Sequence, residues 1–300
     1  MKKNNSLIMR RKAWNQVFLA LSVAAAAFGI LWLALILYEL LSKGLGGLNM
    51  KVFTEITPAG NDEGGLANAI VGTLEITSLA VVLGTPVGLL AGTYLAEYGR
   101  HSWLANLIRF VNDILLSTPS ILVGLFIWQI VVYNVPDSPI ERTCVAILGP
   151  YCFLGHFSGI AGSFALAMIV IPVVVRTTEN MLLLVPNGLR EAAAALGAPR
   201  SNVIVTVTWR AARAGIVTGG LLAIARISGE TAPLMFTVLG QNNWATDMTH
   251  EVAALPLIIY NFANSPYDSQ HALAWAGALL ITATVLTLSV VARLMQPKRS

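Results

Sequence analysis

The chain has 300 residues, of which 56% are hydrophobic and 11% are charged, and its formal net charge is +4. Because a soluble domain carries about a quarter charged residues, this composition excludes an ordinary soluble domain and favours a membrane protein with apolar runs of about 20 residues. The lysines and arginines gather at the ends of apolar stretches, as in membrane proteins, so we expect contact with membrane lipid and none with nucleic acid.

Hydropathy predicts an all-α integral membrane protein with six transmembrane helices. We expect these helices, in chain order, over Trp14–Leu41, Leu66–Ala96, Trp103–Val132, Gly159–Leu184, Gly215–Leu239 and Ala272–Met295. The first apolar run follows a basic segment, residues 1–13, and is far longer than the apolar region of a signal peptide. We therefore expect an uncleaved anchor, with residues 14–300 forming one transmembrane domain.

The distribution of basic residues predicts the orientation of these helices. With the N-terminus inside the cell, 13 lysines and arginines lie on the inner side and three (Lys43, Lys51 and Arg142) on the outer side. Cytoplasmic loops carry the excess of basic residues, so both termini are predicted to be cytoplasmic. The loop of residues 185–214, between the fourth and fifth helices, then lies in the cytoplasm as well.

Two cysteines, Cys144 and Cys152, fall in the outer loop between the third and fourth helices. A disulfide that closes this short loop is expected on the oxidising side of the membrane, and two unpaired thiols are the alternative. The four histidines are scattered over loops and helix ends. No metal site and no cofactor are expected.

Glycines recur every fourth residue in the second helix, at Gly84, Gly88 and Gly92. They share one helix face and let a neighbouring helix approach closely. Ordinary tight packing is the favoured interpretation, and a flexing gate is the alternative.

Charges inside the predicted membrane spans are costly unless they are paired or lie in a wet cavity. Three pairs have a spacing that puts both members on one helix face: Arg109 with Asp113, Arg176 with Glu179, and Arg226 with Glu230. The first pair lies near the cytoplasmic end of its helix and is predicted to be structural. The two deeper arginines suggest a path for an anion, since a guanidinium presents a fork of donors to oxyanions. Two structural ion pairs that lock the bundle are the alternative.

The cytoplasmic loop carries a short amphipathic pattern. Leu189, Ala192, Ala193 and Leu196 form an apolar stripe at helical spacing, and Gly197 ends the helix. A two-turn helix is marginal in water, so we expect it to dock into a groove of a partner protein.

Several segments resemble a known family. Glu191-Ala192-Ala193 followed by Gly197 resembles the EAA motif of ABC importer permeases, through which that family couples to its ATPase. The segments 64–69, 94–98, 118–121, 175–179 and 226–234 are similar to those of PstA-type permease subunits of bacterial phosphate importers. The chain departs from the family at Trp209-Arg210, where Leu-Pro is frequent.

This resemblance implies the fold of a type I ABC importer permease, in the inner membrane of a bacterial cell. It also implies that Arg176 and Arg226, with Glu179 and Glu230 nearby, contribute to phosphate movement, and that residues 189–197 contact the ATPase. The implied partners are a paralogous permease subunit, two ATPase subunits and an extracytoplasmic phosphate-binding protein.

The chain has no Walker A sequence, so we expect a transport subunit without an ATPase site of its own. A permease for another substrate and a self-contained anion transporter remain alternatives. A self-contained transporter is expected to show internal repeats, and none is clear. A membrane-embedded enzyme needs clustered catalytic side chains, which do not stand out.

Overall fold

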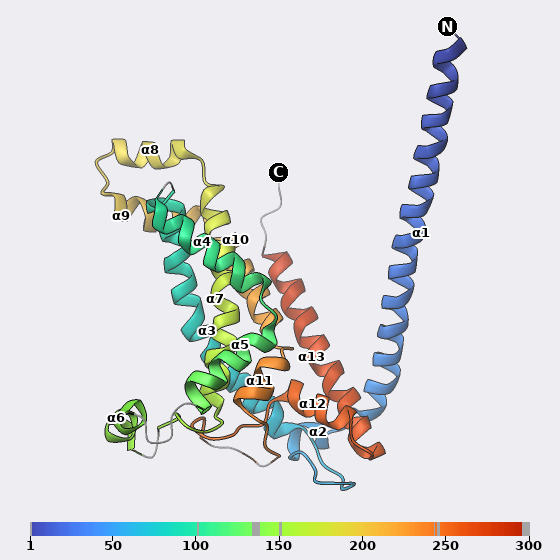
Figure 1. Ribbon diagram of the computed structural model, residues 1–300, viewed down its shortest axis with the longest axis vertical. Helices are drawn as coiled ribbons and strands as arrows, with labels where there is room; N and C mark the ends of the chain where they lie inside the picture. The colour runs from blue at the N-terminus through green and yellow to red at the C-terminus, as the bar shows by residue number, and fades with distance from the viewer. Residues whose placement is uncertain are drawn as a thin grey trace.

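The structure is a computed structural model that describes residues 2–100, 102–133, 139–149, 152–242, 244 and 247–295. Lys298 and Arg299, which contribute to the predicted orientation, lie outside the described residues. Throughout the described part, the regular secondary structure is helical (Figure 1). The elements are α1 (Lys2–Gly47), α2 (Lys51–Thr54), α3 (Ala67–Thr93), η1 (Tyr94–Tyr98), α4 (Trp103–Ser117), α5 (Ser120–Ile127), η2 (Trp128–Tyr133), α6 (Pro139–Leu148), α7 (Gly159–Leu183), α8 (Asn187–Ala195), α9 (Arg200–Asn202), η4 (Val203–Thr208), α10 (Trp209–Ile227), α11 (Ala232–Thr237), α12 (Leu255–Ala263) and α13 (Asp268–Leu294).

Within the described residues, four helices are long and apolar enough to cross a membrane by themselves. They lie in the segments Met9–Gly47, Ala67–Tyr98, Gly159–Leu183 and Asp268–Leu294. The bent pair of α4 and α5 makes a fifth if it is counted as one span. The remaining expected span, the fifth in chain order (Gly215–Leu239), overlaps α10, which carries three arginines in 19 residues and is therefore far less apolar.

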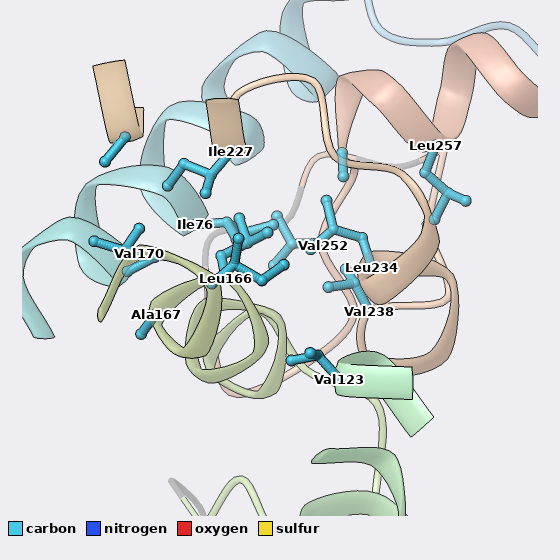
Figure 2. Packing of buried hydrophobic residues seen from close by; sticks show 14 of the residues in the cluster. Ile76, Val123, Leu166, Ala167, Val170, Ile227, Leu234, Val238, Val252 and Leu257 are labelled. Carbon is cyan, nitrogen blue, oxygen red and sulfur yellow. The ribbon is translucent and has the colours of Figure 1, made fainter. Parts of the chain in front are cut away.

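Helix α7 is the central element of the bundle, because two-thirds of its most apolar stretch is buried by its neighbours. Leu166, Val170 and Val174 pack with Ile76 of α3, Ile227 of α10 and Leu234 of α11 in the main apolar core (Figure 2). This part of α7 is apolar and buried, as expected for a helix inside a bundle.

The glycines of α3 allow this helix to lie close against α7. A methyl group added at Gly88 would lie 2.7 Å from Cβ of Val174, and one at Gly92 would lie 2.7 Å from Cβ of Thr178. The tight packing predicted from the glycine spacing is therefore confirmed. Helix α10 approaches α7 in the same way through Gly219, where an added methyl would lie 2.7 Å from Cβ of Thr177.

The predicted third helix is wrong as one continuous helix, because the chain turns by 105° between α4 and the α5–η2 segment. Thr118 has an extended backbone conformation and Pro119 precedes the first residue of α5. A proline lacks the N–H group that would continue the helix and disfavours helical conformation in the residue before it. This proline therefore divides the apolar run into two helices.

The predicted fifth helix also consists of two parts. Helix α10 begins six residues earlier than expected, at Trp209, and ends at Ile227; α11 begins at Ala232. Gly124 of α5 lies against Pro233 near the start of α11, where an added methyl would be 2.6 Å from Cα of the proline. The two short helices thus pack against each other beside α7 (Figure 1).

Helix α1 is attached to the bundle only near its C-terminal end. Gly44 and Gly47 lie against α13, at Leu279 and Ala272, and from there α1 diverges from α13 (Figure 1). The N-terminal end of α1, the C-terminal end of α13 and α8 all lie toward the same end of the molecule. These two helix ends and α8 thus share one end of the described bundle.

Candidate functional site

Two ion pairs connect α4 with α7. Arg109 Nε lies 2.7 Å from Glu179 Oε1, and Arg176 Nη1 lies 3.3 Å from Asp113 Oδ1. The expected pairing within each helix, Arg109 with Asp113 and Arg176 with Glu179, is therefore wrong. Both helices carry an arginine followed one turn later by a carboxylate, and the helices run antiparallel here. Opposite charges consequently meet across the interface instead of along one helix.

The two pairs differ in exposure. Glu179 is buried, and Arg109 also donates to the side chain of Asn106 and to the carbonyl oxygen of Leu95. This pair is therefore largely enclosed by the fold. By contrast, the side chains of Arg176 and Asp113 retain 48% and 56% of their exposure. Arg176 is therefore the member of this group that remains accessible to an anion.

Arg226 lies in the last turn of α10 and its side chain is exposed. Glu230 follows in the break before α11, so the two residues do not share one continuous helix face. Among the described residues, no ion pair joins them. The contact between Gly219 and Thr177 sets α10 against α7, and with it Arg226 lies about 9 Å beyond Arg176 along the helix axis. The two accessible arginines thus lie at successive depths of the bundle.

The apolar stripe of the loop of residues 185–214 lies on the surface of the molecule. Leu189 and Leu196 are 48% and 89% exposed, and Glu191 and Ala192 are exposed as well. No residue of α8 is buried. Gly197 ends the helix with a φ of +81°, a conformation that glycine adopts without strain. The exposed stripe is the kind of surface that a partner's groove covers.

The opposite face of α8 is attached to the bundle by an ion pair that sequence reasoning missed. Arg190 Nη2 lies 2.7 Å from Glu97 Oε1, and the side chains retain 14% and 6% of their exposure. Arg190 also donates to the carbonyl oxygens of Leu182 and Val185. Glu97 and Arg190 are 93 residues apart, so no spacing in the sequence indicates that they meet. We call this interaction the Glu97–Arg190 latch.

Trp209, where the chain departs from the family pattern, has a defined structural role. Its indole Nε1 donates to Thr93 Oγ1 at 3.2 Å, and its ring packs with Ala96, Leu182 and Ala212. The tryptophan therefore connects the start of α10 to the end of α3 without interrupting the helix, since α10 continues directly from η4.

The two cysteines and one further carboxylate lie apart from these groups. Cys144 of α6 and Cys152 are joined by a disulfide, with their Cα atoms 5.6 Å apart. Glu75 of α3 is exposed within an apolar span and has no ion-pair partner among the described residues. No cluster of three or more metal-ligating side chains occurs in the described part of the chain.

Comparison with known proteins places this arrangement in a family. Residues 84–300 match the family described as "Binding-protein-dependent transport system inner membrane component". The chain belongs to this family. The permease is 51% identical to the phosphate transport system permease protein PstA of Pasteurella multocida, with 97% of each chain covered. It is 50% identical to the PstA of Haemophilus influenzae, with 98% of each covered.

Solved structures share the fold of the permease. A chain of the MetNI methionine ABC transporter, in an inward-facing conformation, matches with a TM-score of 0.54 at 19% identity, covering 77% of the permease and 96% of that chain. A chain of a bacterial alginate ABC transporter matches with a TM-score of 0.63 at 12% identity, covering 93% of each. The permease therefore has the fold of a type I ABC importer permease.

Proposed function

We propose that the permease conducts inorganic phosphate across the inner membrane of a bacterial cell, as one subunit of an ATP-driven importer. Half of its residues are identical to those of PstA proteins over nearly the whole length. The observation that supports an anionic substrate is the position of Arg176 and Arg226. Both side chains are accessible, and they lie at successive depths of the bundle. A phosphate ion passing between them exchanges its hydration for guanidinium donors.

The other members of the proposed path act through these arginines. Asp113 limits the uncompensated charge of Arg176 when no anion is present. Glu230, in the break after α10, forms no ion pair with Arg226 among the described residues, and its proposed role is to offset that charge at longer range. Glu179, which was expected beside Arg176, is instead buried against Arg109, so in this proposal it holds α4 against α7 and does not contact the substrate.

Energy reaches the permease through α8. Leu189, Glu191, Ala192, Ala193, Leu196 and Gly197 are the proposed contacts with the ATPase. The exposed stripe occupies the partner's groove, and the Glu97–Arg190 latch transmits its displacement to α3 and α7. The assembly contains a paralogous permease subunit, two ATPase subunits and an extracytoplasmic phosphate-binding protein. In this proposal, the permease has no ATPase site of its own. Its six spans place both termini in the cytoplasm, and the disulfide lies on the extracytoplasmic side of the membrane.

A self-contained anion transporter is a weaker proposal, since the exposed stripe of α8 then has no purpose. Reconstitution of the permease alone separates the two: phosphate flux without an ATPase supports the self-contained transporter. Competition of phosphate uptake by sulfate and molybdate separates phosphate from another oxyanion.

The decisive experiment measures phosphate uptake by Arg176→Ala and Arg226→Ala variants of the assembled importer. We expect uptake to fall by at least tenfold while the subunits still co-purify, because each variant removes a charged donor from the path. Arg293→Ala, an exposed arginine at the end of α13, is the matched control and should transport normally. Wild-type uptake by both path variants would overturn the proposal.

A further inference from the structure

A separate pocket of about 470 Å³ lies between the inner face of α8 and the end of α3. Its polar lining consists of Glu97, Arg100, Asn187, Arg190 and Arg200. Its walls are apolar and are formed by Ala194, Ala198, Val203 and Ile204. The pocket thus gathers three arginines and one carboxylate in a concave space at the base of the loop, and neither Arg176 nor Arg226 belongs to its lining.

The charges in this pocket do not balance. The carboxylate of Glu97 is paired with Arg190. Arg190 donates its hydrogen bonds to this carboxylate, to the side chain of Asn187 and to two carbonyl oxygens. Arg200 donates a hydrogen bond from one terminal nitrogen to the carbonyl oxygen of Glu97. Its guanidinium also stacks on Tyr98, with the guanidinium carbon 4.6 Å from the ring centre. Among the described residues, Arg100 donates one hydrogen bond, from its Nε–H to the carbonyl oxygen of Ala96.

Two guanidinium groups therefore have N–H donors left over. Among the described residues, no acceptor is assigned to the terminal nitrogens of Arg100 or to the second terminal nitrogen of Arg200. The lining as a whole has a charge of +2, from three arginines and one glutamate. Between apolar walls such a charge is screened less than in water, which favours an anion with several acceptor oxygens.

We propose that this pocket binds an oxyanion bearing a phosphate group, held by the forks of Arg100 and Arg200. Planar guanidinium forks match the oxygens of phosphate and bind them through charge-assisted hydrogen bonds. Arg100 follows the end of α3, whereas Arg200 belongs to the loop that carries α8. A bound anion connects these two elements beside the latch and holds the loop in place. This effect on transport rests on the proposed function, whereas binding of the anion does not.

The test measures binding of inorganic phosphate to the full-length permease with its co-purifying subunits, in lipid-free detergent, by calorimetry at constant ionic strength. Arg100→Gln and Arg200→Gln should each weaken binding roughly tenfold, the loss of one charge-assisted contact. Arg293→Gln is the matched control. Arg226→Ala removes the proposed path, and phosphate binding in the pocket should survive it.

A second arm identifies the source of the phosphate group. The titration is repeated with micelles that contain phosphatidylglycerol or phosphatidylcholine. If an anionic lipid headgroup occupies the pocket, phosphatidylglycerol binds and Arg100→Gln reduces that binding; if free phosphate does, inorganic phosphate binds alone. Unchanged binding of both probes in both arginine variants overturns the proposal. A permease that binds phosphate here but does not import it contradicts the proposed function only.

Discussion

The Glu97–Arg190 latch illustrates how much one buried charge can depend on another. Both side chains are almost fully removed from solvent, and a charge at such a site is tolerated only when a partner and further hydrogen bonds replace water. Arg190 satisfies this condition with a carboxylate and two carbonyl oxygens, contributed by η1 and by the end of α7. The position of α8 is thereby fixed by contacts with two elements, η1 and the end of α7.

Removal of the carboxylate by Glu97→Gln should destabilise the permease by roughly 3 kcal/mol, since it leaves the guanidinium of Arg190 buried without its counter-charge. Thermal unfolding of the detergent-solubilised protein measures this loss. The matched control is Glu191→Gln, an exposed glutamate of α8, which should change stability by less than about 0.5 kcal/mol. Equal stability of the two variants would show that the latch contributes nothing.

Gly197 offers a test of α8 itself. The residue has a φ of +81°, and a methyl group added there would meet no atom within 4 Å, so a substitution acts on backbone conformation alone. Gly197→Ala should therefore cost about 1 kcal/mol locally and move Leu196 out of position. We expect weaker retention of the ATPase on the purified permease, measured by co-purification. Undiminished retention would argue against α8 as the contact.

At the scale of elements, the close approach of α3 to α7 depends on the absence of side chains. The added methyl at Gly88 would meet the branched Cβ of Val174, which cannot rotate away. Gly88→Ala should therefore force the helices apart and cost about 1–3 kcal/mol. Gly220→Ala in α10, where an added methyl would meet nothing, should be neutral or slightly stabilising. Comparison of their unfolding temperatures checks both expectations.

Elements were predictable from the sequence where the information is local. The apolar runs indicated α3, α7 and α13 nearly to their ends, and the glycine spacing indicated which face of α3 is packed. The ends of α4 and α10 were missed, because each break is only a few residues long and apolar residues resume directly after it. Pro119 and Pro233 mark those breaks, but a proline inside an apolar run also occurs within continuous membrane helices.

Contacts of the site residues were likewise predictable only where they depend on local sequence. Helical spacing predicted an apolar stripe with Leu189 and Leu196, and both side chains are exposed, in α8 and directly after it. Spacing within a helix could not reveal that Glu179 meets Arg109, or that Glu97 meets Arg190, since each contact depends on how two distant helices pack. The arginines were recognisable as exceptional from their position in apolar runs, whereas their partners required the fold.

At the scale of the whole molecule, the common position of α8 and both ends of the bundle yields a prediction of orientation. A Leu196→Cys substitution in a background of Cys144→Ser and Cys152→Ser provides one exposed thiol on α8. A membrane-impermeant maleimide should label it in inside-out vesicles and not in intact cells. Labelling from outside intact cells would invert the proposed topology.

The crossed ion pairs of α4 and α7 restrict how the molecule can change shape. A slip of α4 by one turn in one direction would bring Arg109 against Arg176, and a slip in the other would bring Asp113 against Glu179. Either register sets like charges opposite each other, so neither offers a second resting position for a one-turn ratchet. We therefore expect α4 and α7 to move together as one rigid body. Any switch between open and closed states then has to occur by rotation where this pair contacts the neighbouring helices.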